Sequence, residues 1–335
     1  MAFSNAAVSD IIATTIESRT KNPADNLTNN NPLLFTLKKK GNVKYVTGGS
    51  IIDQEIMYND PATGNAASFA GYDPLNITPD SPISAFQFAL KHYASAISIS
   101  GPEILANSGK EQMIDLLATR VEVSDARLAN KIDLDLHGDG TGNSGKNIVG
   151  TLSMISTTPT VGTYGGVDRS VWAFARNFST TSTIVNGVPA TSANIQALMN
   201  NASLAVVRGN DKVDLIYMGN TAYTLYLQSL TSIQRITSDG SDSLAGAGFT
   251  ALKFYGHGGN ADVVYGGGIG GNQTATRIDF INTKHVFFRP HKDRNFTMIG
   301  SERQSINQDA VIRFQGWSGA LTSDGPQFNA VALTT

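Results

Sequence analysis

The feature that most constrains this chain is an apolar stripe with helical spacing that runs through residues 113–136. Ser108 and Glu111 stand in front of it at the spacing of a capping box, so the helix is predicted to begin near residue 108. A helix of that length is a rod of roughly 40 Å, far longer than the average globular helix. Its other face is expected to be solvated, with subunit contacts as the alternative, and carries Arg120, Glu122, Asp125, Arg127, Lys131 and Asp133.

The residues before this helix predict an arm and a projection. Residues 5–19 have the apolar spacing of a short amphipathic helix, and the Asn- and Pro-rich stretch 21–32 reads as an extended connector. Alternating patterns predict strands at 33–37, 43–58 and 83–100. The polar insert 59–82 between them is predicted to be a projecting two-stranded hairpin. Because an isolated hairpin is marginal in water, we expect something outside its own subunit to cover it.

The second half of the chain predicts a compact α/β unit followed by a series of strands. Thr191 is expected to cap one helix and Asn220 another, with a buried strand at 213–218 between them. The tail is predicted to form successive strands at residues 277–282, 285–288, 296–300, 310–316 and 328–333. The expected fold class is therefore α+β.

Composition excludes several classes of protein. The net charge of −2, from 25 basic and 27 acidic residues, gives no global attraction for nucleic acid. The chain has no cysteine, which removes disulfides, thiolate metal sites and cysteine nucleophiles. Asp10 and Glu17 interrupt what would be the apolar region of a signal peptide, and no later apolar stretch reaches the ~18 residues of a membrane span. We expect neither classical export nor a membrane protein.

A search for catalytic motifs finds no convincing site. Residues 140–146 match the spacing of a phosphate-binding loop, but Asn147 replaces the Ser or Thr that binds Mg²⁺, and the loop follows a helix. Asp133 and Asp135 imitate the start of a calcium loop whose final Glu is missing. The five histidines form no short ligand pair. We expect no catalytic residue, no metal and no cofactor, although a nucleotide-dependent enzyme using residues 140–146 stays open as a minor alternative.

The arrangement of arm, hairpin, long helix, α/β unit and C-terminal strands resembles the HK97-fold major capsid proteins of tailed bacteriophages. The more specific segments are residues 31–41 leading into Gly48 and Gly49, residues 100–111 at the start of the long helix, and residues 139–142 after it. The resemblance implies an N-arm (1–44), an E-loop hairpin (45–99), a P-domain with its spine helix and sheet (100–150 and 284–335) and an α/β A-domain (151–283).

The same resemblance implies a function. It indicates a major capsid protein that is not an enzyme and that assembles as hexamers and pentamers into an icosahedral head around double-stranded DNA. A tail-tube protein is the main alternative. The implied partners are a separate scaffolding protein, because no scaffold-like region precedes the arm, a portal protein, in some heads a decoration protein, and DNA in non-specific contact. The implied location is the virion capsid, assembled in the host bacterial cytoplasm, with no membrane involved.

Charge distribution suggests which segments touch between subunits. Residues 45–90 contain no Lys or Arg, so a covalent Lys–Asn link from the hairpin, as some relatives make, is not expected. We instead expect the acidic hairpin to lie over a basic strand region of an adjacent subunit, with Arg289 and Arg294 as the preferred carboxylate partners. The candidate residues are Asp53, Glu55, Asp60, Asp73 and Asp80 on the hairpin, and Lys284, Arg289, Lys292, Arg294 and Arg303 on the strands.

Overall fold

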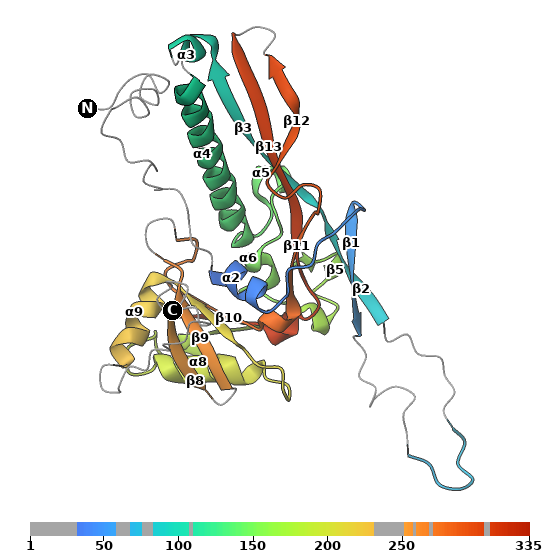
Figure 1. Ribbon diagram of the computed structural model, residues 1–335. Helices are drawn as coiled ribbons and strands as arrows, with labels where there is room; N and C mark the ends of the chain where they lie inside the picture. Colours follow the sequence, from blue (N-terminus) through green and yellow to red (C-terminus); the bar gives the residue numbers. More distant parts are fainter. Residues whose placement is uncertain are drawn as a thin grey trace.

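The computed structural model contains a six-stranded sheet, a four-stranded sheet, a long helix and a projecting hairpin (Figure 1). It describes residues 32–57, 68–75, 83–106, 110–230, 251–256, 259–267, 271–304 and 309–335. The amphipathic helix expected at 5–19 lies outside these residues. The mixture of helices with largely antiparallel sheets confirms the α+β class.

The first described element is a helix, α2 (Pro32–Lys39), where the sequence predicts a strand. That prediction is wrong, because Pro32 sits at the first helical position, where its fixed φ favours a helix. Leu33 and Leu37, four residues apart, are fully buried on one side of α2, as helical spacing requires. After α2 the chain runs parallel to a later strand, with single bridges from Val43 and Val46.

Strands β1 (Ile51–Met57) and β2 (Ile83–Ala89) form the antiparallel hairpin, and β3 (Lys91–Ser100) continues directly from β2. The strands predicted at 83–100 and in the second half of 43–58 are thus confirmed. Figure 1 shows the hairpin leaving the body of the molecule at the lower right. This geometry carries residues 68–75 away from both sheets.

The long helix is α4 (Lys110–Leu136), preceded by the short α3 (Gly101–Ala106). It lies along a sheet whose central strand is β13 (Ala310–Ser323), and Figure 1 shows the two side by side. Strand β3 pairs with one edge of β13, and β11 (Val286–Pro290) and β12 (Thr297–Gln304) follow each other along the other edge. The predicted long helix is confirmed.

The second sheet has six strands in the order β6-β14-β10-β7-β9-β8. Helices α8 (Ile195–Ala205) and α9 (Asn220–Ser229) pack against it, and residues of both are buried in its apolar core. Its strands are β6 (Phe178–Thr181), β7 (Leu215–Met218), β8 (Ala251–Gly256), β9 (Gly259–Tyr265), β10 (Arg277–Ile281) and β14 (Ala330–Leu333).

Strand β14 lies in this six-stranded sheet, between β6 and β10. The expected range 284–335 instead assigns residues 330–333 to the sheet beside α4. The difference arises because the chain crosses back after β13 and pairs with β6 and β10, where Ala330, Val331 and Ala332 are buried. The five tail strands predicted from the sequence are confirmed as β10 to β14.

Several short elements complete the description. They are α5 (Gly142–Gly145), α6 (Thr151–Met154), β4 (Thr163–Tyr164), β5 (Val167–Asp168), η1 (Ala173–Ala175), α7 (Ser182–Asn186), η2 (Thr283–His285) and η3 (Pro326–Phe328). The elements η2 and η3 lie where the chain passes between the two sheets, and these crossovers are the centre of the site described next.

Candidate functional site

The base of the hairpin has two different faces. Ile52, Ile56, Phe86 and Phe88 are buried on one face, where the two phenylalanine rings contact Tyr164. The base of the hairpin is therefore covered by its own chain. Most of the insert 59–82, for which cover by another subunit is expected, lies outside the described residues. The other face is exposed at Ile51, Asp53, Glu55 and Met57 of β1 and at Ile83, Gln87 and Ala89 of β2.

The structure places the five acidic candidates differently. Asp53 and Glu55 are exposed in the middle of the outer hairpin face. Asp73 is exposed in a turn that it stabilises itself, accepting from the backbone N–H of Ala70 at 2.8 Å. Asp60 and Asp80 lie outside the described residues. Of the five acidic candidates, Asp53 and Glu55 are therefore the two that the structure places together, on the outer face of the hairpin.

The basic candidates also separate into groups. Lys284 forms an ion pair of 2.5 Å with Asp211, and Arg289 donates to Gln54 and Thr322, so both are engaged within their own chain. Lys292 and Arg294 are exposed in the loop between β11 and β12. The backbone of Arg303 belongs to β12, and its side chain lies outside the described part of the structure. Lys292 and Arg294 are therefore the candidates with described, exposed side chains.

The charged face predicted for the long helix is only partly exposed. Glu122, Arg127 and Lys131 are exposed, as expected. Asp133 is buried and accepts from the Asn272 amide at 2.8 Å, so its assignment to the solvated face is wrong. Arg120 also turns inward and bonds to Glu103 at 3.0 Å. The physical reason is that α4 is covered on two sides, by the four-stranded sheet and by residues 271–277.

A buried polar cluster joins the end of α4 to the six-stranded sheet. Arg277 forms an ion pair of 2.7 Å with Asp279, whose carboxylate also accepts from Gln273. Burial raises the pKa of Asp279, and the adjacent Arg277 opposes that shift. His137 is fully buried nearby, where desolvation, helped by the charge of Arg277, lowers the pKa of its imidazole to about 4. Sequence alone gave no signal for this cluster, because its members come from distant segments.

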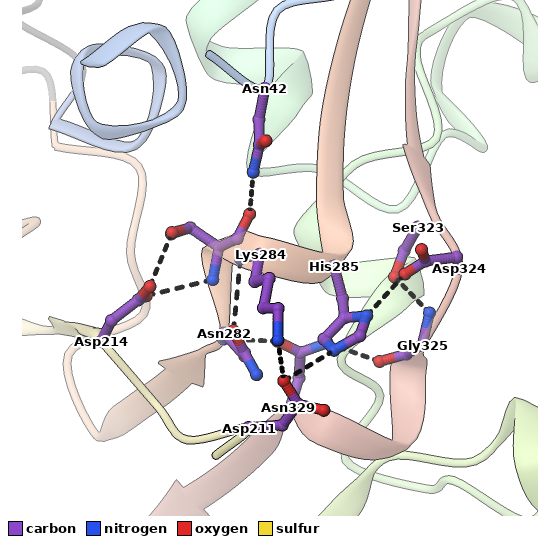
Figure 2. Close-up of polar contacts among 11 residues, drawn as sticks. Asn42, Asp211, Asp214, Asn282, Lys284, His285, Ser323, Asp324, Gly325 and Asn329 are labelled. Carbon is purple, nitrogen blue, oxygen red and sulfur yellow. Dashed lines mark hydrogen bonds and ion pairs between the residues drawn. The ribbon is translucent and has the colours of Figure 1, made fainter. Parts of the chain in front are cut away.

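The crossovers between the sheets form a second polar cluster, which we call the junction (Figure 2). Its buried part is held by amides and hydroxyls. Asn329 accepts from the N–H of Asn282 at 2.9 Å and donates to the carbonyl of Gly325 at 3.2 Å. Thr283 donates through its backbone N–H and its hydroxyl to Asp214, at 3.0 and 2.8 Å. The Asn282–Asn329 bond ties the outgoing crossover (282–285) to the returning crossover (324–329), and the Thr283 bonds tie the outgoing crossover to Asp214, the residue before β7.

The outer part of the junction is charged. Figure 2 shows Lys284 and His285 directed toward Asp211, which belongs to the loop between α8 and β7. The hydrogen bond from Lys284 is the main cause that lowers the pKa of Asp211. Lys40, just after α2, pairs with Asp214, and the Asn42 amide donates to the Thr283 carbonyl. The arm, both crossovers and the α8–β7 loop therefore meet at one point.

The glycine-rich loop at 140–146 has the conformation of a turn and lacks that of a phosphate-binding loop. Asn143 and Ser144 both adopt positive φ, 52° and 56°, and the loop follows α4 where a phosphate-binding loop would follow a strand. Asp135 belongs to the segment that imitates the start of a calcium loop. Its carboxylate accepts hydrogen bonds from Tyr93, Lys131 and Asn147 of the same chain. Among the described residues, no three His, Asp or Glu side chains are grouped to hold a metal ion. Within the same ranges, no helix has the length and apolar character of a membrane crossing.

Comparison with known proteins identifies the fold. The sequence matches no protein-family model and no curated protein. The structure matches the capsid asymmetric unit of cyanophage A-1(L) with a TM-score of 0.62 and 13% sequence identity, covering 96% of this chain and 97% of that chain. The chain has the HK97-like capsid fold. Below, we use the name E-loop for the β1–β2 hairpin, spine helix for α4, P-domain sheet for the four-stranded sheet and A-domain sheet for the six-stranded sheet.

Two further structures share the HK97-like fold with this chain. The SrpI encapsulin complex from Synechococcus elongatus matches with a TM-score of 0.56 and 9% identity, covering 100% of this chain and 96% of that chain. A structure from Mycobacterium phage Bobi matches with a TM-score of 0.54 and 12% identity, covering 98% of this chain and 99% of that chain. All three likenesses extend over nearly the whole length of both partners.

Proposed function

We propose that this chain is the major capsid protein of a tailed bacteriophage and self-assembles into an icosahedral head around double-stranded DNA. The observation that carries the proposal is the agreement in architecture over 96% of this chain and 97% of a cyanophage capsid subunit. The projecting E-loop hairpin, the long spine helix and the two large sheets of the described residues support the proposal. A shell subunit covers area through many moderate contacts, and a projecting E-loop suits that task.

Assembly into hexamers and pentamers is part of the proposal, together with the partners that a head requires. These are a separate scaffolding protein, a portal protein and, in some heads, a decoration protein. The packaged DNA would meet the shell only through non-specific contacts, which the near-neutral charge of the chain supports. Assembly would occur in the cytoplasm of the host bacterium, and the product would be the virion capsid.

Electron microscopy and sedimentation of the expressed full chain test this proposal, with the chain alone and together with a candidate scaffolding protein. We expect closed shells of uniform diameter. Open tubes would favour a tail-tube protein, and a persistent monomer that binds nucleotide on titration would favour an enzyme using residues 140–146. Shells isolated from infected cells should contain double-stranded DNA. Shells that contain only protein would contradict the phage-head function while leaving the shell-forming fold intact.

We further propose that the outer face of the E-loop contacts the β11–β12 loop of an adjacent subunit. The outer face presents Asp53 and Glu55 between apolar side chains at both ends, Ile51 on one side and Met57 on the other. The β11–β12 region presents a matching combination, with Lys292 and Arg294 exposed near two partly exposed apolar side chains, Phe296 and Met298. Complementary charge in such a contact fixes register more than it adds affinity.

This contact involves fewer residues than the sequence predicts. Arg289 is directed to Gln54 and Thr322 of its own chain, so we assign it to holding the base of the E-loop. Lys284 is assigned to the junction through Asp211. Single pairs of this exposed kind are worth only about 0 to 1 kcal/mol. Repeated at every subunit of a closed shell, even weak pairs contribute to the choice of register.

A further inference from the structure

His285 occupies a position that touches both crossovers of the junction. It is the last residue of η2, directly before β11 of the P-domain sheet. Its ring stacks on Phe328 of the returning crossover, with ring centroids 4.3 Å apart and an angle of 17° between the planes. Its carbonyl accepts from the N–H of Asp324. A change at this one side chain therefore reaches both connections between the sheets.

The two ring nitrogens of His285 face two different carboxylates (Figure 2). Nδ1 lies 2.8 Å from the carboxylate of Asp324, and Nε2 lies 3.7 Å from that of Asp211. Nε2 is buried and has no hydrogen-bond partner. A neutral imidazole carries one proton, so a ring that donates to Asp324 presents a lone pair to Asp211. Only the protonated ring offers an N–H to both carboxylates.

The other charged groups around the ring act mainly on its carboxylate partners. Lys284, on the same short helix, pairs with Asp211 at 2.5 Å and partly neutralises it. Arg289 of β11 and Tyr164 of β4 interact electrostatically with Asp324. Arg208 of the α8–β7 loop lies over the ring of Phe328, 5.7 Å from its centroid. The groups nearest the imidazole nitrogens are the two carboxylates.

We propose that His285 is a pH-sensitive clamp that fixes the junction between the A-domain and the P-domain when its ring is protonated. In this state the ring joins Asp324 of the returning crossover to Asp211 of the α8–β7 loop. On deprotonation the attraction to Asp211 is lost, and the lone pair of Nε2 then faces that carboxylate. Acid favours the protonated imidazole, so acid closes the clamp and base loosens it.

Hydrogen exchange of the full chain, followed by mass spectrometry at pH 5.5 and pH 8.0, tests the clamp. Exchange times are scaled for the intrinsic effect of pH on amide exchange, and wild type and variants are compared in the same assembly state. Peptides that contain residues 282–286 and 323–329 report on the two crossovers. We expect these peptides to exchange about two- to fivefold faster at pH 8.0, the range for a partly exposed ion pair.

His285→Gln should abolish this pH difference, whereas His291→Gln, a matched histidine outside the junction, should retain it. Asp211→Asn keeps the bond from His285 to Asp324 and should reduce the difference; it decides the outcome if His285→Gln does not fold. Equal protection of the wild type at both pH values would overturn the proposal. So would a full pH difference in either junction variant. The readout is independent of shell formation, so a failure of the capsid proposal does not affect it.

Discussion

The imidazole of His137 stacks face to face on the phenol ring of Tyr217, with centroids 4.7 Å apart and planes 7° from parallel. His137 directly follows the spine helix, and Tyr217 lies on β7 in the middle of the A-domain sheet. Neither ring nitrogen of His137 has a hydrogen-bond partner, and the nearest carboxylate, Asp133, is 3.9 Å from Nε2. The spine helix is thus joined to the A-domain through a buried, neutral histidine.

This stack predicts loss of stability in acid. The pKa of His137 is lowered to about 4, chiefly by burial, so the fold binds its neutral form in preference to its charged form. Its contribution is complete above the ordinary histidine pKa of about 6.5 and is lost as the pH falls toward 4. Denaturant unfolding at pH 7.5, 5.5 and 4.5 should show that the free energy of unfolding falls as the pH falls. This fall should be smaller in His137→Phe than in the wild type, by at most about 3 kcal/mol. The same decline in both proteins would contradict the assignment.

Asp133 and Glu122 on the spine helix form a matched pair of substitutions. Asp133→Ala removes a buried carboxylate and leaves the Asn272 amide without this acceptor, so it should lower the free energy of unfolding by about 1 to 3 kcal/mol. Glu122→Ala removes an exposed carboxylate from the same helix and should change it by less than about 0.5 kcal/mol. Urea denaturation measures both. Equal effects would mean that the burial of Asp133 contributes nothing.

Alanine substitutions at Gly165 and Gly166 distinguish the effect of close packing from that of backbone strain. Both have positive φ, 55° and 77°, so alanine is strained at either position. A Cβ on Gly165 would lie 2.8 Å from Cβ of Phe86 at the E-loop base, whereas a Cβ on Gly166 meets open space. Gly165→Ala should therefore lower the thermal midpoint more than Gly166→Ala, whose cost from backbone strain alone is about 1 to 2 kcal/mol. A larger fall in the thermal midpoint for Gly166→Ala would show that Phe86 moves aside without a measurable cost.

Charge reversal tests the proposed E-loop contact. In purified heads, Arg294→Glu should lower the thermal stability at low salt, because like charges would face Asp53 and Glu55 across the contact. The second reversal Asp53→Lys should restore part of the loss. Lys146→Glu, an exposed cation on the glycine-rich loop, is the control and should have no such effect. If Arg294→Glu and Lys292→Glu heads match wild type at every salt concentration, apolar contacts alone hold the E-loop.

The shell should be held together without covalent links from the E-loop. Residues 45–90 contain no lysine to attack an asparagine of a neighbouring subunit. Mature heads boiled in detergent should therefore release a single band at the mass of the monomer, 35.5 kDa. A ladder of covalent oligomers would refute this prediction.

Local patterns predicted most of the elements correctly, and the errors have local explanations. The spine helix and the tail strands carry long, regular apolar periods. Residues 33–37 contain four apolar side chains in five positions, a run in which helix and strand cannot be distinguished by period, and only Pro32 indicated the helix. Asp133 has the spacing of an exposed residue, but the A-domain covers a second side of the spine helix, which no local pattern records.

The junction could not be predicted for a different reason. His285 meets Asp324 across 39 positions of sequence, and Thr283 meets Asp214 across 69. Asp, Asn and Lys are common surface residues, so nothing in the sequence marks these as partners. Their proximity follows from the topology, in which the chain leaves the A-domain sheet after β10 and returns to it as β14.

The long strand β13 and the spine helix are elements of nearly equal length, about 46 Å and about 40 Å from their residue numbers. Their responses to stretching differ. The hydrogen bonds of β13 to its neighbours stand across its axis, so a pull along that axis loads many of them together in shear. Those of the helix lie along its axis and are loaded in series, so they yield one after another. In a wall that is stretched along this direction, β13 and its neighbours would therefore carry more of the load than the spine helix beside them.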